Sequence, residues 1–93
     1  MFEITEKEKN DVLDLYFEST NPLVLRQLPS KQKRKYICLL WIVAQLDKDV
    51  KYSEKALNAI LKPIYHDYVM IRRYLVDYKL LTRKADGSAY WVT

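Results

Sequence analysis

The chain has 93 residues, which is enough for one domain whose core needs neither disulfides nor a metal. Hydrophobic residues make up 49% of the chain, which excludes a disordered chain. Its apolar run 36–44 is far shorter than the roughly 20 residues of a membrane-spanning helix, which excludes a membrane-spanning protein. The net charge of +4 is divided unevenly, because residues 1–29 carry three basic and six acidic side chains whereas residues 30–93 carry thirteen and six; a basic body suits a polyanionic partner.

The first helix is predicted over residues 5–19. Thr5 and Glu8 have the spacing of a capping box, in which each side chain accepts the other residue's backbone N–H. Asn21-Pro22 is expected to end the helix, since proline disfavours helical backbone in the residue before it. Its apolar stripe is formed by Val12, Leu13, Tyr16 and Phe17. We expect this stripe either to pack on the second helix of the same chain or to pair with a neighbouring chain in a homodimer.

The second helix is predicted over about Lys31 to Asp47, with Ser30 as N-cap, after an apolar linker that packs across the domain. Most of this helix is apolar all round, which is typical of a central helix. Its first turn instead carries four cations, which are Lys31, Lys33, Arg34 and Lys35. Cations oppose the helix dipole at that end, so bound phosphate would compensate for them. The alternative is that water and salt screen them and that they serve solubility.

A short extended segment and a third helix follow the polar turn 47–51. Val50 to Tyr52 is long enough for only a very short strand, and Ser53 is expected to cap a helix over Glu54 to Leu61. Pro63 ends that helix. Its buried face is predicted to contain Leu57, Ile60, Leu61 and, past the turn, Ile64.

The last segment, 65–92, is predicted to form a fourth helix and a β-hairpin. Asp67 is a suitable N-cap, and one face of the helix carries the apolar set Tyr68, Ile71, Leu75 and Tyr78. Arg73 lies about 160° around the helix from Ile71 and is therefore expected to face solvent. Asp86-Gly87 predicts a tight turn between Leu81–Lys84 and Ser88–Val92.

The expected fold is mostly α with a small antiparallel sheet, which is the α+β class. We interpret the order helix, short strand, helix, turn, helix, hairpin as a winged helix-turn-helix with an extra N-terminal helix. One domain is expected over residues 1–93, with the helix 5–19 preceding a winged-helix body at 30–93. The short strand is expected to pair with the hairpin in a three-stranded sheet. Trp41, Ile60, Leu75 and Leu80 are predicted to be largely buried.

Four motifs resemble a bacterial family catalogued as domain of unknown function 2087. In this chain they are LPSKQKRK (28–35), YSEKALN (52–58), DY-x-x-IRR-x-LVDY (67–78) and GS-x-YW (87–91). The resemblance covers roughly residues 22–93 and implies a winged-helix character of the kind found in proteins that resemble transcriptional regulators. Members of the family usually have glycine after the second Asp-Tyr pair, where this chain has Lys79. Either the lysine adopts the left-handed conformation, or the helix ends differently.

No residue pattern indicates catalysis. His66, the one histidine, lies in a predicted turn beside the capping Asp67, where surface histidines are common. Cys38, the one cysteine, lies in an apolar helix, which predicts a small core residue with a raised pKa. No Cys/His cluster indicates zinc, and a single glycine excludes a glycine-rich phosphate loop. We therefore expect no enzyme, metal or cofactor, and a reducing cytoplasm is the expected location.

Two functions fit the pattern, and fold alone does not decide between them. In the first, the fourth helix enters the major groove of duplex DNA with Val69, Met70 and Arg73 toward the bases. The cations at the start of the second helix, together with Arg83 and Lys84, would contact phosphates, and Arg72 either joins them or pairs with a local carboxylate or carbonyl. In the second, Val69 and Val76 form an apolar surface that binds a protein partner. We favour the first function.

Overall fold

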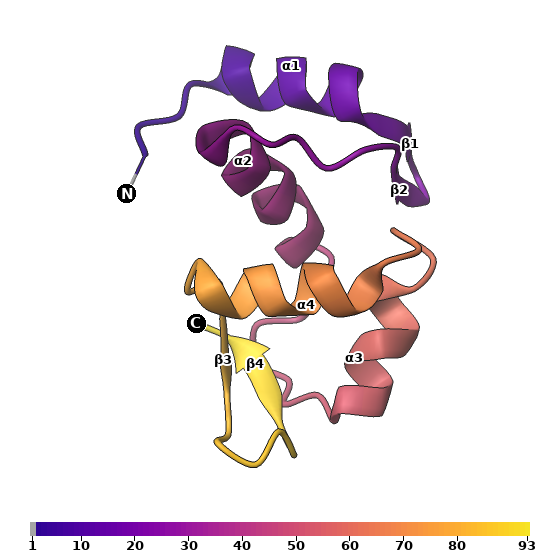
Figure 1. Ribbon diagram of the computed structural model, residues 1–93, viewed down its shortest axis with the longest axis vertical. Helices are drawn as coiled ribbons and strands as arrows, with labels where there is room; N and C mark the ends of the chain where they lie inside the picture. Colours follow the sequence, from indigo (N-terminus) through magenta and orange to yellow (C-terminus); the bar gives the residue numbers. More distant parts are fainter. Residues whose placement is uncertain (1) are drawn as a thin grey trace.

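The computed structural model describes residues 2–93, and it contains four helices and two small antiparallel sheets (Figure 1). The helices are α1 (Glu6–Tyr16), α2 (Gln32–Val43), α3 (Glu54–Leu61) and α4 (Tyr68–Asp77). The strands are β1 (Phe17–Thr20), β2 (Leu23–Leu25), β3 (Leu81–Arg83) and β4 (Tyr90–Val92). Figure 1 shows α1 across the start of α2 at one end of the molecule and the β3–β4 hairpin at the other. The expected α+β class is confirmed.

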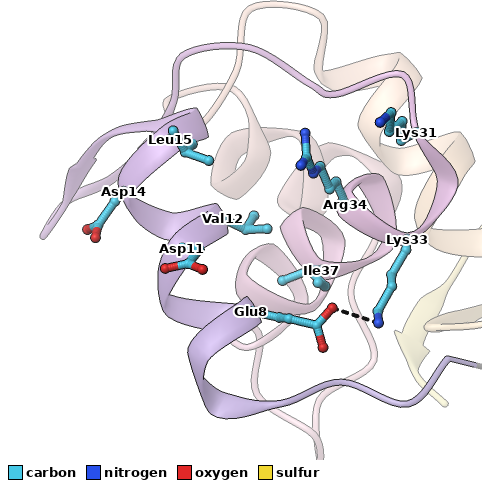
Figure 2. Close-up of a pocket in the computed structure, with 9 residues that line it drawn as sticks. All are labelled: Glu8, Asp11, Val12, Asp14, Leu15, Lys31, Lys33, Arg34 and Ile37. Carbon is cyan, nitrogen blue, oxygen red and sulfur yellow. Dashed lines mark ion pairs between the residues drawn. The ribbon is translucent and has the colours of Figure 1, made fainter.

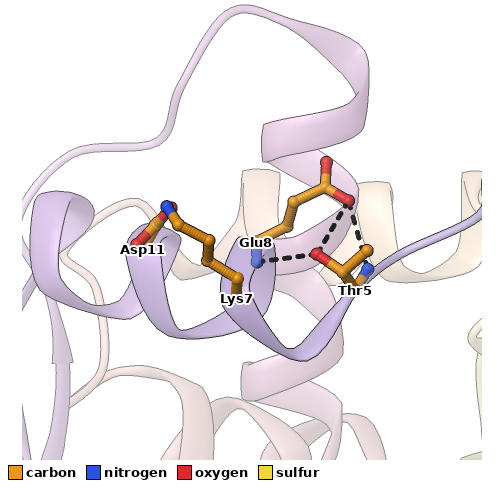
Figure 3. A network of polar contacts seen from close by, with 4 residues as sticks. All are labelled: Thr5, Lys7, Glu8 and Asp11. Carbon is orange, nitrogen blue, oxygen red and sulfur yellow. Dashed lines mark hydrogen bonds and ion pairs between the residues drawn. The ribbon is translucent and has the colours of Figure 1, made fainter.

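The N-terminus of α1 has the predicted capping box (Figure 3). The Glu8 backbone N–H donates to Thr5 Oγ1 at 3.1 Å, and the Thr5 N–H donates to Glu8 Oε1 at 3.1 Å. One turn along, Lys7 Nζ pairs with Asp11 Oδ2 at 2.8 Å, a contact that raises the pKa of Lys7. Local sequence therefore determines where this helix begins.

The end of α1 differs from the prediction, because the helix stops at Tyr16 and not at about Ser19. Phe17 already has extended backbone and begins β1, which pairs with β2 through an irregular antiparallel register. The turn between the two strands contains a cis Asn21–Pro22 peptide bond. Phe17, Leu23 and Leu25 are buried. The segment expected to be an apolar linker is thus partly a strand, and pairing with that strand overrides the helical spacing of Phe17.

α1 packs on α2 of its own chain, so the intrachain option for its apolar stripe is confirmed. Val12 is buried between the two helices. The indole N–H of Trp41 donates to the backbone oxygen of Lys9 at 3.0 Å, and the ammonium group of Lys9 lies 5.1 Å from the centre of the Trp41 ring. In the β1–β2 hairpin that follows α1, the Leu25 N–H donates to Ile64 O at 2.8 Å, and this bond joins β2 to the α3–α4 turn.

α2 is shorter than predicted and has a different N-cap. Lys31 occupies the cap position without a side-chain hydrogen bond, so the assignment of Ser30 as N-cap is wrong. The helix ends at Val43, where the Gln45 and Leu46 N–H groups bond to carbonyls three residues back. This tighter turn carries Leu46 into the core, which explains why the helix does not reach Asp47.

α3 has the predicted bounds, and the core is only partly as expected. The Ser53 hydroxyl accepts the Ala56 N–H at 3.1 Å. Leu57, Leu61, Ile64 and Leu75 are buried, as predicted. Trp41, Ile60 and Leu80, also predicted to be largely buried, are partly buried and pack around that core, so they are less enclosed than Leu75. The partial burial of Trp41 accompanies a hydrogen bond, because its indole N–H donates to the Lys9 carbonyl.

The C-terminal hairpin forms as predicted, with Gly87 at φ 75° in its turn. Tyr90 points into the core and Trp91 is half-buried. The expected three-stranded sheet is wrong, because the segment before α3 contributes a single bridge at Tyr52. That residue exchanges two backbone hydrogen bonds with Tyr90, of 2.7 and 2.8 Å. The sheet is therefore two strands with a one-residue extension.

α4 ends in a left-handed residue, although that residue is not glycine. Lys79 has φ 61°, its N–H donates to Val76 O at 2.9 Å, and the next N–H, from Leu80, donates to Leu75 O at 2.9 Å. These two bonds define a Schellman motif. Lys79 thus takes the conformation for which glycine is preferred, which was the first of the two options.

Candidate nucleic-acid interface

α4 buries one side and exposes the other. The Asp67 carboxylate accepts the Met70 N–H at 3.2 Å and fixes the start of the helix, as predicted. Ile71 and Leu75 are buried against the core. On the far side, Val69 is 50% exposed, Arg73 is exposed and Met70 is partly so. The predicted recognition residues Val69, Met70 and Arg73 therefore share one outward-facing side of the helix.

A groove of about 310 Å³ lies between α4 and the β3–β4 hairpin, and we call it the α4–hairpin groove. It brings Arg73 of the helix and Arg83 of the hairpin to the same depression, with Val69 and Val76 beside them. Two carboxylates, Glu54 and Asp77, also line it. The remaining lining residues are Arg72 and Tyr90. The groove is mixed in character, with three guanidinium groups against two carboxylates.

Arg72 is held inside the protein. Its guanidinium donates to Asn58 Oδ1, lies 3.4 Å from Glu54 Oε1 and sits 5.9 Å from the centre of the Tyr90 ring. The Tyr90 hydroxyl donates to the same Glu54 oxygen at 3.0 Å. Burial and this bond to Glu54 raise the pKa of Tyr90. With its side chain 16% exposed, Arg72 ties α4 to α3 and the hairpin, which is the local pairing considered for it.

Arg73, Arg83 and Lys84 differ in how far they are engaged. Among residues 2–93, the Arg73 side chain has neither an ion pair nor a hydrogen bond, and the pairing with Asp77 that its spacing allows is not formed. Arg83 donates to the backbone oxygens of Lys84 and Ala85 at 3.2 and 3.0 Å, so it braces the hairpin turn. Lys84 is exposed in that turn. Arg73 is thus the guanidinium most available to a ligand.

The four cations at the start of α2 do not form one surface with Arg73 and Arg83. Lys33 Nζ pairs with Glu8 Oε2 at 2.6 Å, and Arg34 donates to the Tyr16 hydroxyl at 3.1 Å, so both face α1. Lys31 borders the same side, on the depression between α1 and α2 that Figure 2 shows. Lys35 alone turns toward α4, with its ammonium group 4.5 Å from the centre of the Tyr74 ring.

The partners of these residues were not found by sequence reasoning. Glu54 and Asn58 stand four residues apart on α3 and therefore share a face, which is the one local signal for the Arg72 site. Nothing local connects Arg34 to Tyr16 or Lys33 to Glu8, because those pairs form only when α1 folds back on α2.

Other chemistry is limited in the part of the chain that the structure describes. No group of three His, Cys, Asp or Glu residues that could hold a metal ion occurs among residues 2–93. No helix there is long and apolar enough to cross a membrane. Cys38 is fully buried, and burial raises its pKa to about 12, as the sequence predicted in direction. Its thiol is therefore protonated at neutral pH and is a poor nucleophile. His66 is exposed beside the Tyr65 ring.

Comparison with known proteins places most of the chain in one group. Residues 24–92 match the model of domain of unknown function 2087, described as an uncharacterized protein conserved in bacteria. Comparisons with curated proteins and with solved structures gave no match. The matched region includes α2 to β4, and α1 and β1 lie outside it.

Proposed function

The chain belongs to this uncharacterised bacterial family, and we propose that it binds duplex DNA through the surface formed by α4 and the β3–β4 hairpin. In this proposal the fold acts as a winged helix-turn-helix, with α3 and α4 as the helix pair and the hairpin as the wing. The protein would be a transcriptional regulator that works in the cytoplasm.

The observation that carries the proposal is the outward side of α4. Arg73 is exposed and has no ion pair among residues 2–93, Val69 is half-exposed one turn earlier, and both border the groove that Arg83 also lines. The major groove of B-DNA is wide enough to admit an α-helix. A guanidinium there can bond guanine O6 and N7 together, and an apolar side chain can contact the thymine methyl group. α4 has both kinds of side chain on its free side.

The remaining cations support the flanks of such a complex. Arg83 and Lys84 lie at the hairpin, and Lys35 lies against Tyr74 at the opposite side of α4. Phosphate contacts of this kind position a protein on DNA without reading the sequence. Lys33 and Arg34 are directed to α1, and Arg72 to α3, so in this proposal they contribute through the fold and not through direct contacts.

Fluorescence anisotropy with a labelled mixed-sequence duplex, at several salt concentrations, tests the proposal. We expect binding at low salt that weakens steeply with salt, because each neutralised phosphate contributes a slope of about 0.9 in a plot of log affinity against log salt. Arg83→Gln should reduce that slope by about one contact. Arg73→Gln should weaken binding by about 5- to 150-fold, since losing a base contact of this kind costs about 1–3 kcal/mol.

Lys7→Gln is the matched control, because it removes one positive charge from α1, at the far end of the molecule from the hairpin. Binding should change little in this variant. If Lys7→Gln weakens binding as much as Arg73→Gln, the attraction is a general effect of net charge and α4 is not the reading helix. No binding at low salt would reject the proposal.

The second candidate function is binding of a protein partner at the same place. Glu54 and Asp77 line the α4–hairpin groove and would repel phosphate, and Val69 and Val76 give it an apolar margin. A peptide with both apolar and basic groups would fit these features. Absence of DNA binding at low salt, in a chain that is correctly folded, favours this candidate.

A further inference from the structure

The depression between α1 and α2, which we call the α1–α2 groove, has a volume of about 570 Å³. Figure 2 shows one wall formed by α1 and the other by the start of α2, with Val12 and Ile37 between them. This groove lies apart from the α4–hairpin groove, and none of its lining residues is shared with that groove.

The two walls carry opposite charge in equal number. The wall from α1 contains Glu8, Asp11 and Asp14, and the wall from α2 contains Lys31, Lys33 and Arg34. A small anion would be repelled by the first wall and a small cation by the second. The ligand that such a surface matches is another surface with an acidic and a basic strip side by side.

Some of these charged side chains form no ion pair among residues 2–93. Glu8 pairs with Lys33, Asp11 with Lys7, and Arg34 bonds the Tyr16 hydroxyl. Asp14 and Lys31 have no ion pair among residues 2–93, and Figure 2 places them at opposite margins of the groove. Leu15, beside Asp14, is 58% exposed.

We propose that two copies of the chain pair face to face through the α1–α2 groove. A two-fold axis that runs along the groove places the acidic wall of each copy opposite the basic wall of the other. Asp14 of one copy then meets Lys31 of its partner, the reciprocal pair forms by symmetry, and Leu15 of each copy is covered. The geometry is self-complementary only in this orientation, because an axis across the groove would oppose like charges.

This surface differs from the one that the sequence suggested for a homodimer. The stripe of Val12, Leu13, Tyr16 and Phe17 is engaged within the chain, and Val12 and Phe17 are buried there. The next side of α1, with Asp14 and Leu15, is the one left for a partner. Surface ion pairs contribute little affinity but strongly restrict orientation. The dimer is therefore expected to be weak and salt-sensitive.

Sedimentation velocity of the purified chain, without DNA, tests the proposal. We expect the mass to rise from monomer to dimer as the protein concentration increases to about 1 mM, a range in which weak complexes are populated. D14K and K31D should each shift the sedimentation coefficient to that of the monomer, because each creates two like-charge contacts across the axis. Circular dichroism should show that both variants remain folded.

An equimolar mixture of D14K and K31D gives the decisive result. In that mixed dimer every acidic position again faces a basic one, so two monomeric variants should recover the dimer when combined. K55E is the matched control for charge, because Lys55 is exposed on α3 and outside the groove, and it should dimerise like the wild type. A wild-type chain that stays monomeric, a dimer that is insensitive to both variants, or a mixture that stays monomeric overturns the proposal. The DNA-binding proposal is unaffected by any of these outcomes.

Discussion

Lys79 is the one residue other than glycine with a positive φ in the part of the chain that the structure describes. Its Cβ disfavours this conformation by roughly 1–2 kcal/mol. The left-handed conformation of Lys79 is tolerated because two backbone hydrogen bonds, to Val76 O and Leu75 O, close the end of α4 around it. The strain therefore lies where the helix passes into the hairpin.

Lys79→Gly is predicted to stabilise the protein by about 0.5–1 kcal/mol. Glycine removes the steric cost at φ 61° but adds about 0.4–1 kcal/mol of conformational entropy to the unfolded chain, so the net gain is smaller than the strain. Urea unfolding followed by circular dichroism measures the change. Lys79→Ala is the control, because it removes the charge and keeps the Cβ; equal gains in both variants would assign the effect to charge.

At the scale of the residue, the N-caps of α1, α3 and α4 were predictable, whereas the N-cap of α2 and the partners of the charged side chains were not. Thr5, Ser53 and Asp67 each bond an N–H three residues along the chain, so spacing alone identifies them. Arg72 was expected either to contact phosphate or to pair locally, and its contacts to Glu54 and Tyr90 depend on how α3 and the hairpin pack on α4. Those contacts decide that Arg72 holds the fold, whereas Arg73 has no ion pair in the part of the chain that the structure describes.

At the scale of the element, the Glu8 carboxylate both caps α1 and forms an ion pair that links α1 to α2. Glu8 accepts the Thr5 N–H in the capping box and pairs with Lys33 of α2. The Lys33 ammonium, followed by the Thr5 N–H, lowers the pKa of Glu8 below its ordinary value of 4.5. A depressed folded-state pKa gives stability that is present above the unfolded value and is lost as pH falls through the folded value.

Glu8→Gln is therefore predicted to lower the melting temperature at neutral pH and to have little effect in acid well below pH 4.5. Glutamine can still accept the Thr5 N–H, so the difference isolates the charge on Glu8. Thermal melts of both proteins across this range measure it. Glu6→Gln, in the same helical turn, serves as the control. A deficit in Glu8→Gln that stays constant with pH would contradict the role of the ion pair.

Element boundaries were predicted well where they depend on local signals. α3, α4 and the β3–β4 hairpin begin and end close to the expected residues, because Ser53, Asp67 and the Asp86-Gly87 turn act within a few positions. The β1–β2 hairpin was missed for the opposite reason. Phe17 continues the helical spacing of Val12 and Tyr16, and only its pairing with Leu25 makes the backbone extended.

At the scale of the whole molecule, the sequence showed that the two halves differ in charge, but it did not show which groups the basic side chains contact. Lys33 and Arg34 were expected to contact phosphates together with Arg83, beside the base contacts of Arg73, but in the structure they face α1. The acidic first helix thus neutralises part of the basic body within the chain. The surface that we propose for DNA is therefore narrower than the composition suggested, and it is centred on α4.

The family match begins at Val24, inside β2, while the strand that pairs with β2 lies before it. A chain trimmed to residues 24–93 would lose β1 and Leu23, and it would leave the rest of β2 as an open edge. Open edges recruit strands from other molecules. The trimmed chain would also lose the buried Phe17, and removing a buried aromatic ring costs about 3–5 kcal/mol. That cost is a large part of the roughly 5–15 kcal/mol that stabilises a typical domain.

We predict that the trimmed chain aggregates, as measured by light scattering, and that an added peptide of residues 2–22 slows the aggregation. A trimmed chain that stays monodisperse and melts like the full chain would contradict this. The segment before the family domain therefore protects that domain from aggregation, because its strand β1 covers the edge of β2.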